Sequence, residues 1–264
     1  MLISIITISY NSKKTIERTI KSVLAQSYTD FEYIIIDGAS TDGTLEIIKK
    51  YEPLFDGRMK WVSETDHGIY NAMNKGVAKS AGDVIGIVNS DDWLEPTALE
   101  SIATMIGAND YSNKVFCGSM MFHYEDGSSI YYKADEKKFK EGAPQYSLNR
   151  GLFHPAMFVP KAIYDQYGMF DESIKVSADV DFIFRCFEAG VEFVFKDVLI
   201  SHMSDGGASN IIDLKVFRND YKRFLTNRGL DGFSLCWHLY RRYFILLIKK
   251  YSPLFFLKLY RNVK

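Results

Sequence analysis

The first ninety residues alternate short apolar runs with segments of helical periodicity, and this alternation restricts the fold more than any other feature. Runs at 3–9, 31–36, 59–63 and 84–88 are rich in β-branched and aromatic residues, as in strands buried on both faces. Between these runs, apolar residues recur every three or four positions, which predicts helices. The order therefore predicts an α/β domain with a parallel sheet.

Every predicted strand is followed by polar residues. The four ends read Ser9-Tyr10-Asn11, Asp37-Gly38, Glu64-Thr65-Asp66 and Asn89-Ser90-Asp91-Asp92. In sheets of this kind, ligands bind outside the carboxyl ends of the strands. Because three of the four ends carry carboxylates, we expect a binding site at this edge of the sheet.

Asp91 and Asp92 come directly after the fourth strand. Their hard oxygen atoms suit Mg²⁺ or Mn²⁺, which take the rest of their ligands from water and phosphates. Such an ion would stabilise a departing diphosphate. The alternative is a solvated turn in which either acid caps a helix that begins at 93–96.

The second half of the chain has a more mixed pattern. Segments 115–124 and 129–133 predict a hairpin, 177–189 a helix and 192–200 a strand. No clear linker precedes residue 210 or so. We therefore expect one domain over 1–210, followed by an extension.

Segment 37–44, Asp-Gly-Ala-Ser-Thr-Asp-Gly-Thr, matches neither a phosphate-binding loop ending in Gly-Lys-Ser/Thr nor a GxGxxG fingerprint. Nucleotide hydrolases and Rossmann dehydrogenases are therefore disfavoured. A carboxylate here suits the imide N–H of uracil, although capping of the next helix is an alternative.

Seven short stretches together carry a family resemblance. They are TISYN (7–11), DGASTDGT (37–44), SETDHGIYNAMNKG (63–76), AGD (81–83), NSDD (89–92), HPA (154–156) and SADVDFIFR (177–185). Over roughly residues 1–210 the chain resembles the bacterial family 2 glycosyltransferases of GT-A fold. It looks most similar to the subgroup that builds O-antigen, capsule or exopolysaccharide repeat units. The resemblance implies a Rossmann-type mixed sheet flanked by helices, with a nucleotide-sugar half at 1–95 and an acceptor half at 96–210.

The resemblance also implies the donor site. Residues implied at the nucleotide are Thr7, Tyr10, Asn11, Asp37 and Asp66, with Asp91 at the ribose or diphosphate. Asn74 and Lys75 share one face of the helix predicted from 69 onward, away from its apolar stripe. A cation there would stabilise the leaving diphosphate, although a solvated helix face explains the same pattern.

For the chemistry, the resemblance assigns Asp92 to the metal, Mn²⁺ or Mg²⁺, with His202 as a weaker second ligand. Asp179 takes the position of the catalytic base; the family often has Glu-Asp there, whereas this chain has Ala178-Asp179. An acid favoured by the helix dipole is the alternative. His154 and Asp181 fall on the acceptor side. A packed histidine and an i, i+4 ion pair of Asp181 with Arg185 are their structural alternatives.

The C-terminal segment 211–264 predicts a helical extension rich in basic and aromatic residues. After Asp231 there are seven Lys or Arg residues and no acid. Such a segment suits an anionic membrane surface, while packing on its own domain or a homodimer contact are alternatives. The net charge of −1 gives no attraction to nucleic acid. Three cysteines without metal-ligand spacing favour a reducing compartment. With no signal peptide or spanning segment expected, we predict a cytoplasmic protein, peripheral at the inner face of the cell membrane.

The sequence thus predicts a metal-dependent, inverting hexosyltransferase. Its donor is a nucleotide sugar, with a UDP-sugar favoured, and its acceptor is a polyprenyl-diphosphate-linked saccharide. A nucleotidyltransferase is one alternative, although segment 9–15, SYNSKKT, lacks the glycines of its usual loop. A non-catalytic sugar-nucleotide-binding or scaffold protein is the other.

Overall fold

The computed structural model describes residues 1–107, 110–142, 151–205, 214–226, 228–229, 231–233 and 237. The chain divides into two compact units. The first comprises Met1–Glu172 with Ala178–Gly207, and the second Ser173–Ser177 with Ala208–Lys264.

The first unit alternates strands and helices in its amino-terminal half. Its elements there are β1 (Ile3–Ser9), α1 (Ile16–Leu24), β2 (Phe31–Asp37), α2 (Thr44–Tyr51), η1 (Glu52–Phe55), β3 (Met59–Ser63), α3 (Ile69–Lys79), β4 (Val84–Ile87), β5 (Trp93–Leu94) and α4 (Ala98–Ile106). The later elements are β6 (Lys114–His123), β7 (Ser129–Tyr132), α5 (Glu136–Gly142), η3 (His154–Ala156), β8 (Met157–Pro160), α6 (Lys161–Tyr167), α7 (Ala178–Glu188) and β9 (Glu192–Ser204).

Nine of the described strands form one sheet in the order β3-β2-β1-β4-β8-β6-β9-β5, with β7 paired to β6. Strands β1 to β4 are parallel, whereas β8 runs antiparallel to β4 and β6. The predicted mixed α/β architecture is confirmed. The strand order reverses between β1 and β4, and α/β folds bind ligands at such a switch point.

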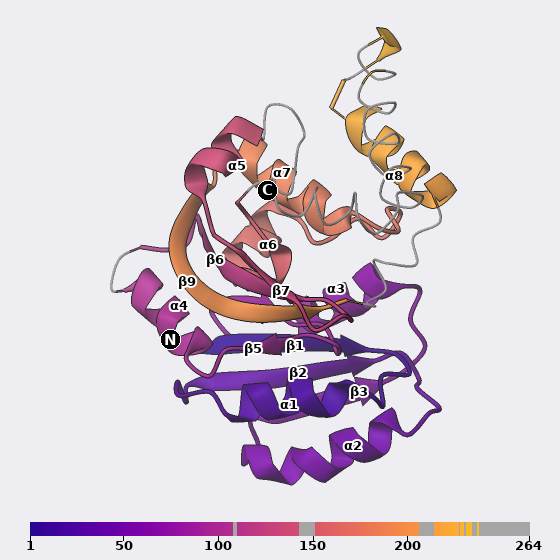
Figure 1. Cartoon of the computed structure of the whole chain (residues 1–264), viewed down its shortest axis with the longest axis vertical. Coiled ribbons are helices and arrows are strands. Elements are labelled where there is room, and N and C mark those ends of the chain that lie inside the picture. The colour runs from indigo at the N-terminus through magenta and orange to yellow at the C-terminus, as the bar shows by residue number, and fades with distance from the viewer. Residues whose placement is uncertain are drawn as a thin grey trace. The chain divides into compact units, whose positions relative to one another are not determined.

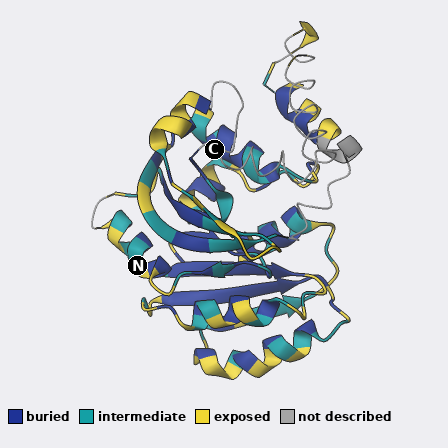
Figure 2. Ribbon diagram, viewed as in Figure 1, coloured by how far each residue is buried: buried dark blue, intermediate teal, exposed yellow. Residues whose placement is uncertain are grey.

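Helices cover both faces of the parallel strands. Figure 1 shows α1 and α2 on one face of β1 to β3 and α3 on the other, as right-handed crossovers require. Every residue of β1 and β2 is buried (Figure 2), which explains their unbroken apolar sequence. Ile5, Tyr33 and Phe55 belong to the largest hydrophobic cluster beneath α1 and α2.

Most predicted elements are present, including the β6–β7 hairpin and helix α7. The prediction of a helix that begins at 93–96 is wrong. Trp93 and Leu94 instead form β5, which pairs antiparallel with His202 and Ser201 of β9, and α4 begins only at Ala98. The partner strand lies more than a hundred residues away in the sequence, so local pattern does not reveal the pairing.

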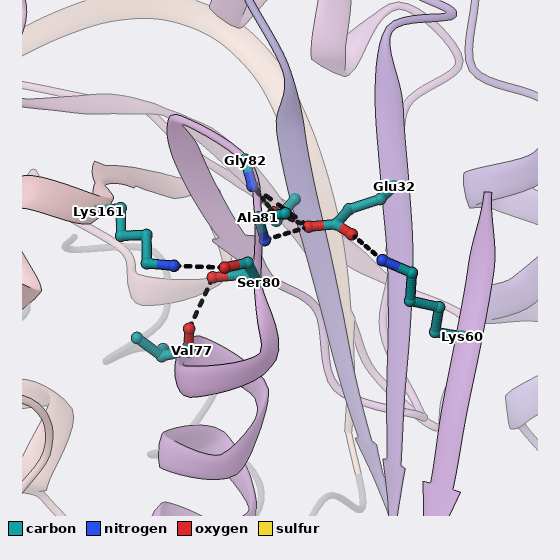
Figure 3. A network of polar contacts seen from close by, with 8 residues as sticks. Glu32, Lys60, Val77, Ser80, Ala81, Gly82 and Lys161 are labelled. Carbon is teal, nitrogen blue, oxygen red and sulfur yellow. Dashed lines mark hydrogen bonds and ion pairs between the residues drawn. The ribbon is translucent and has the colours of Figure 1, made fainter.

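A buried carboxylate connects several segments at the amino edge of the sheet, where the parallel strands β1, β2 and β4 begin (Figure 3). The Oε1 atom of Glu32 accepts hydrogen bonds from the Ser4 hydroxyl at 2.7 Å and from the N–H groups of Ala81 and Gly82 at 2.5 and 3.2 Å. Its Oε2 atom pairs with Lys60 at 3.1 Å. Burial alone would raise the pKa of Glu32, but these partners outweigh it and lower the pKa.

In the second unit, α8 (Leu214–Thr226) carries Asp220, which is buried and accepts the N–H groups of Lys175 and Val176 at 2.7 and 2.8 Å. Most of the predicted basic-aromatic extension lies outside the described residues. Within the described part of the chain, no helix combines the length and the apolar character needed to span a bilayer.

Candidate functional site

The loops after β1 and β4 meet at the switch point. The hydroxyls of Ser12 and Ser90 lie 2.7 Å apart and tie the two loops together. Tyr10, at the end of β1, is 68% exposed. Asn11 adopts a left-handed φ of 49°, and its side chain accepts the Thr41 N–H at 3.0 Å. Strained backbone of this kind clusters at binding sites.

Tyr10, Gly38 and Asp66 come together from three strand ends. A Cβ on Gly38 would lie 3.1 Å from the Asp66 carboxylate and 3.3 Å from the Tyr10 ring. A side chain there would require both neighbours to move by a few tenths of an ångström, so glycine leaves this close approach undisturbed. The sequence predicted these strand ends to converge, and the fold brings them together.

Thr7 and Asp37 lie beneath this surface. Both are fully buried. The Asp37 carboxylate accepts the Ser9 and Ser63 hydroxyls at 3.0 and 2.7 Å and the Ser40 N–H at 2.9 Å. Thr7 accepts the Tyr33 hydroxyl at 3.0 Å. In this structure both residues support the loops that carry the exposed groups.

Asp92 is a buried and poorly compensated carboxylate. It is 1% exposed and accepts the Ser204 N–H and the Asn89 amide, each at 3.2 Å. No ion pair reaches Asp91 or Asp92 among the described residues. Burial and then the charge of Asp91 raise the pKa of Asp92 to about 7.

These groups fit a divalent cation. The raised pKa of Asp92 indicates negative charge that needs a counterion, and burial raises the pKa of Asp91 as well. The buried Oδ1 atom of Asn89 has no hydrogen-bond partner among the described residues. The same part of the chain contains no cluster of three His, Cys, Asp or Glu residues suited to a metal. A cation here would thus take its remaining ligands from water and a diphosphate, as Mg²⁺ does.

The turn that carries the two acids is held by Arg18 of α1. The Arg18 guanidinium donates to the carbonyl of Asp91 at 2.7 Å and to the Ser204 hydroxyl at 2.6 Å. It also lies 3.7 Å from the centre of the Trp93 ring, a cation–π arrangement. The sequence did not predict a role for Arg18, because its hydrogen-bond partners Asp91 and Ser204 lie 73 and 186 residues away along the chain.

His202, the weaker metal candidate, belongs to a hydrogen-bonded chain. Its Nε2 atom lies 2.7 Å from Glu95 Oε1, and its Nδ1 atom lies 2.9 Å from Nε2 of His123. Its ring stacks on Trp93 with centroids 4.8 Å apart. Both ring nitrogens therefore have protein partners, and metal binding by His202 would require one of these contacts to break.

Helix α3 directs its two predicted donor residues to different neighbours. Lys75 pairs with Asp66 at 2.7 Å and with Glu64 at 2.9 Å. The Asn74 amide exchanges two hydrogen bonds with the backbone of Phe170, at 2.9 and 3.0 Å. Lys75 thus lies beside the end of β3, whereas Asn74 ties α3 to the segment that precedes α7.

Asp179 lies in the first turn of α7 and is half-buried. Its Oδ1 atom accepts the hydroxyl of Tyr70 on α3 at 2.9 Å. His154 packs edge-on against Phe170, with centroids 5.9 Å apart, and burial lowers the pKa of His154 although Asp179 opposes this. His154 therefore lies close enough to the predicted base for the two to interact electrostatically.

Asp181 makes the ion pair that its spacing predicted. Its carboxylate lies 2.9 Å from Nε of Arg185, and it is only 6% exposed. Arg185 also donates to the backbone of Met169 at 2.6 Å. Asp181 thus anchors the loop after α6.

Sequence reasoning missed Tyr70, Arg18, His123 and Glu95. Tyr70 lies inside the matching stretch 63–76, and a hydroxyl next to an apolar stripe was the available signal. The other three had no local signal, because each contacts a residue of β9 that is distant in the sequence.

Comparisons with known proteins agree with this geometry. Residues 4–167 match the family described as glycosyl transferase family 2. The PGL/p-HBAD biosynthesis glycosyltransferase of Mycobacterium bovis (strain BCG / Pasteur 1173P2) is 31% identical over 219 residues, which are 82% of this chain and 82% of that protein.

Solved structures show the same fold. S. aureus TarS 1-349 in complex with UDP-GlcNAc has a TM-score of 0.65 at 21% identity, covering 90% of this chain and 70% of that one. The mannosyltransferase PcManGT from Pyrobaculum calidifontis, in complex with GDP-Man and Mn²⁺, has a TM-score of 0.62 at 15% identity, with 88% and 65% covered. This chain covers 41% of the protein in a further TarS crystal structure. The chain therefore belongs to the family 2 glycosyltransferases and has their GT-A fold.

Proposed function

We propose that this glycosyltransferase inverts the anomeric centre of a nucleotide-sugar donor, with a UDP-sugar favoured over other nucleotide sugars. The observation that carries the proposal is the carboxyl edge of the sheet. Tyr10, Gly38 and Asp66 converge there, and the loop after β4, which Ser90 ties to the β1 loop, carries the buried and poorly compensated Asp92. The complexes of TarS with UDP-GlcNAc and of PcManGT with GDP-Man support the donor class.

Asp92, Asp91 and the Asn89 side chain would hold Mn²⁺ or Mg²⁺. Such an ion supplies charge stabilisation to a departing diphosphate. The complex of PcManGT with Mn²⁺ supports this assignment. Tyr10 is exposed enough to stack on the base, and Asp66 with Lys75 borders the same surface.

Asp179 acts as the base in this proposal. It takes the proton of an acceptor hydroxyl as that oxygen forms a bond to the anomeric carbon. The bond from this carbon to the diphosphate breaks, and its electron pair leaves with the nucleotide. His154 lies close enough to Asp179 for the charge of Asp179 to act on its pKa, and we assign His154 to the acceptor side of the site.

We infer a surface-polysaccharide role of the O-antigen, capsule or exopolysaccharide type, with a polyprenyl-diphosphate-linked saccharide as acceptor. A basic, aromatic C-terminal segment would hold the enzyme at the inner face of the cell membrane. The division into a catalytic domain over 1–210 and an extension over 211–264 is part of this proposal. Packing of the extension in a homodimer remains the competing arrangement.

The test combines binding and turnover. Thermal unfolding with UDP-Glc, UDP-Gal, UDP-GlcNAc or GDP-Man, each with and without Mn²⁺, should show one UDP-sugar raising the midpoint only when Mn²⁺ is present. Release of UDP in the presence of aryl glycosides then measures transfer, and Asp179→Asn should lower kcat at least about a hundredfold without weakening donor binding. Unchanged kcat in Asp179→Asn would place the base elsewhere. Binding without any turnover would favour the non-catalytic alternative.

A further inference from the structure

Tyr70 is the side chain that contacts the predicted base most directly, and the reaction described above leaves it without a role. It is 7% exposed, and its hydroxyl donates to Asp179 Oδ1 at 2.9 Å. Burial and the charge of Asp179 raise the pKa of Tyr70 well above its usual value. The hydroxyl therefore stays protonated and remains a donor throughout the working pH range.

The ring of Tyr70 is fixed by its neighbours. It packs on Phe170 with centroids 5.7 Å apart, and Phe170 packs on Phe182 at 5.4 Å. Phe182 belongs to α7, the helix that carries Asp179. The same aromatic cluster thus holds both partners of the hydrogen bond.

Helix α3 is tied to both sides of the site. Asn74 bonds twice to the backbone of Phe170, and Lys75 pairs with Asp66 at the donor edge. Tyr70 lies one turn from Asn74 on the same helix. The predicted base therefore receives its hydrogen bond from the helix that also carries Lys75, the partner of Asp66.

We propose that Tyr70 is a positioning residue that holds the Asp179 carboxylate by its Oδ1 atom, so that Oδ2 is turned toward the acceptor hydroxyl and receives its proton. This inference rests on the function proposed for Asp179. A carboxylate with one oxygen fixed has a single orientation for the attack geometry, whereas a free one samples several rotamers.

The experiment compares Tyr70→Phe with Tyr164→Phe. Tyr164 is 3% exposed and stacks on Phe182 at 4.8 Å, so its substitution removes a hydroxyl from the same aromatic cluster without touching Asp179. With UDP-GlcNAc and the other UDP-sugars as donors and aryl glycosides as acceptors, Tyr70→Phe should lower kcat about ten- to a hundredfold. The donor KM and the unfolding midpoint should match those of Tyr164→Phe, whose kcat should stay within about twofold of wild type.

A double variant separates the two claims. Tyr70→Phe should have no further effect on kcat in an Asp179→Asn background, because the group it positions is gone. The positioning role is overturned if Tyr70→Phe turns over like wild type while Asp179→Asn does not, or if the two effects multiply. Wild-type turnover by Asp179→Asn would instead overturn the proposed base, and the role of Tyr70 with it.

Discussion

The two edges of the central sheet each bury a carboxylate, but they treat it in opposite ways. At the amino edge, Glu32 accepts two N–H groups and a hydroxyl and pairs with Lys60, and its pKa is lowered. At the carboxyl edge, Asp92 accepts two long hydrogen bonds and its pKa is raised to about 7.

The difference separates an acid whose charge the protein matches from the acid that we propose binds a ligand. Glu32 fixes the loop between α3 and β4, and its charge is fully matched by the protein. Among the described residues, the charge of Asp92 is matched by only two long hydrogen bonds and no ion pair, which leaves it in need of a counterion. A perturbed carboxylate at a strand end that also lies at the topological switch point is therefore a strong candidate for ligand binding.

Replacing each carboxylate by its amide should distinguish Asp92 from Glu32 most clearly in the rate of sugar transfer. Asp92→Asn should lower metal-dependent kcat by about a hundred- to a thousandfold, because the amide carries no charge for the cation. Glu32→Gln should stay within about threefold at 25 °C, since Glu32 lies at the opposite edge. Equal losses in the two variants, measured as UDP release, would show that both acids act through folding.

Stability should respond in the reverse order. Glu32→Gln turns an amide NH₂ toward existing donors and should lower the free energy of unfolding by about 2–4 kcal/mol. Asp92→Asn removes a buried charge, and the Asn89 amide can turn its unpartnered oxygen toward the new NH₂. Its free energy of unfolding should rise by about 1–2 kcal/mol. Urea unfolding in EDTA measures both, and a destabilised Asp92→Asn would contradict the assignment.

The third comparison is the pH dependence of that stability. The folded pKa of Asp92, about 7, exceeds its usual 3.8, so its neutral form stabilises the fold below pH 4 and this contribution is lost as pH rises to 7. The advantage of Asp92→Asn over wild type should therefore grow from pH 4 to 7. The folded pKa of Glu32 is lowered, so its contribution is present above about 4.5 and lost in acid. Unfolding curves from about pH 3 to 8, without metal, cover the titration of both groups. The account would be contradicted if both wild-type-to-variant differences in the free energy of unfolding rose with pH, or if both fell.

The local sequence pattern was sufficient to predict the first four strands, the helices between them and the convergence of the strand ends. Buried parallel strands are recognisable because they form continuous apolar runs. The local pattern was not enough for β5, since Trp93 and Leu94 resemble the start of a helix until β9 pairs with them. The roles of Arg18 and Tyr70 likewise depend on partners 73 and 109 residues away.

At the candidate site, the sequence was sufficient to predict where the acids lie, but not which groups surround each of them. Asp37 and Asp92 are both buried acids at strand ends, yet Asp37 is surrounded by hydroxyls and an N–H group. The packing of Ser9, Ser40 and Ser63 around Asp37 distinguishes it from Asp92, which has Asp91 beside it instead. The positions of Ser9 and Ser63 follow from the register of three strands.

Binding of Mn²⁺ in the presence of UDP, followed by the electron paramagnetic resonance signal of free Mn²⁺, tests the central claim most directly. Wild type and Glu32→Gln should bind the ion with equal affinity, and binding should weaken below pH 7 as Asp92 takes up a proton. Asp92→Asn should bind at least about tenfold more weakly. Wild-type affinity in Asp92→Asn would contradict the assignment of this edge of the sheet as the donor and metal site.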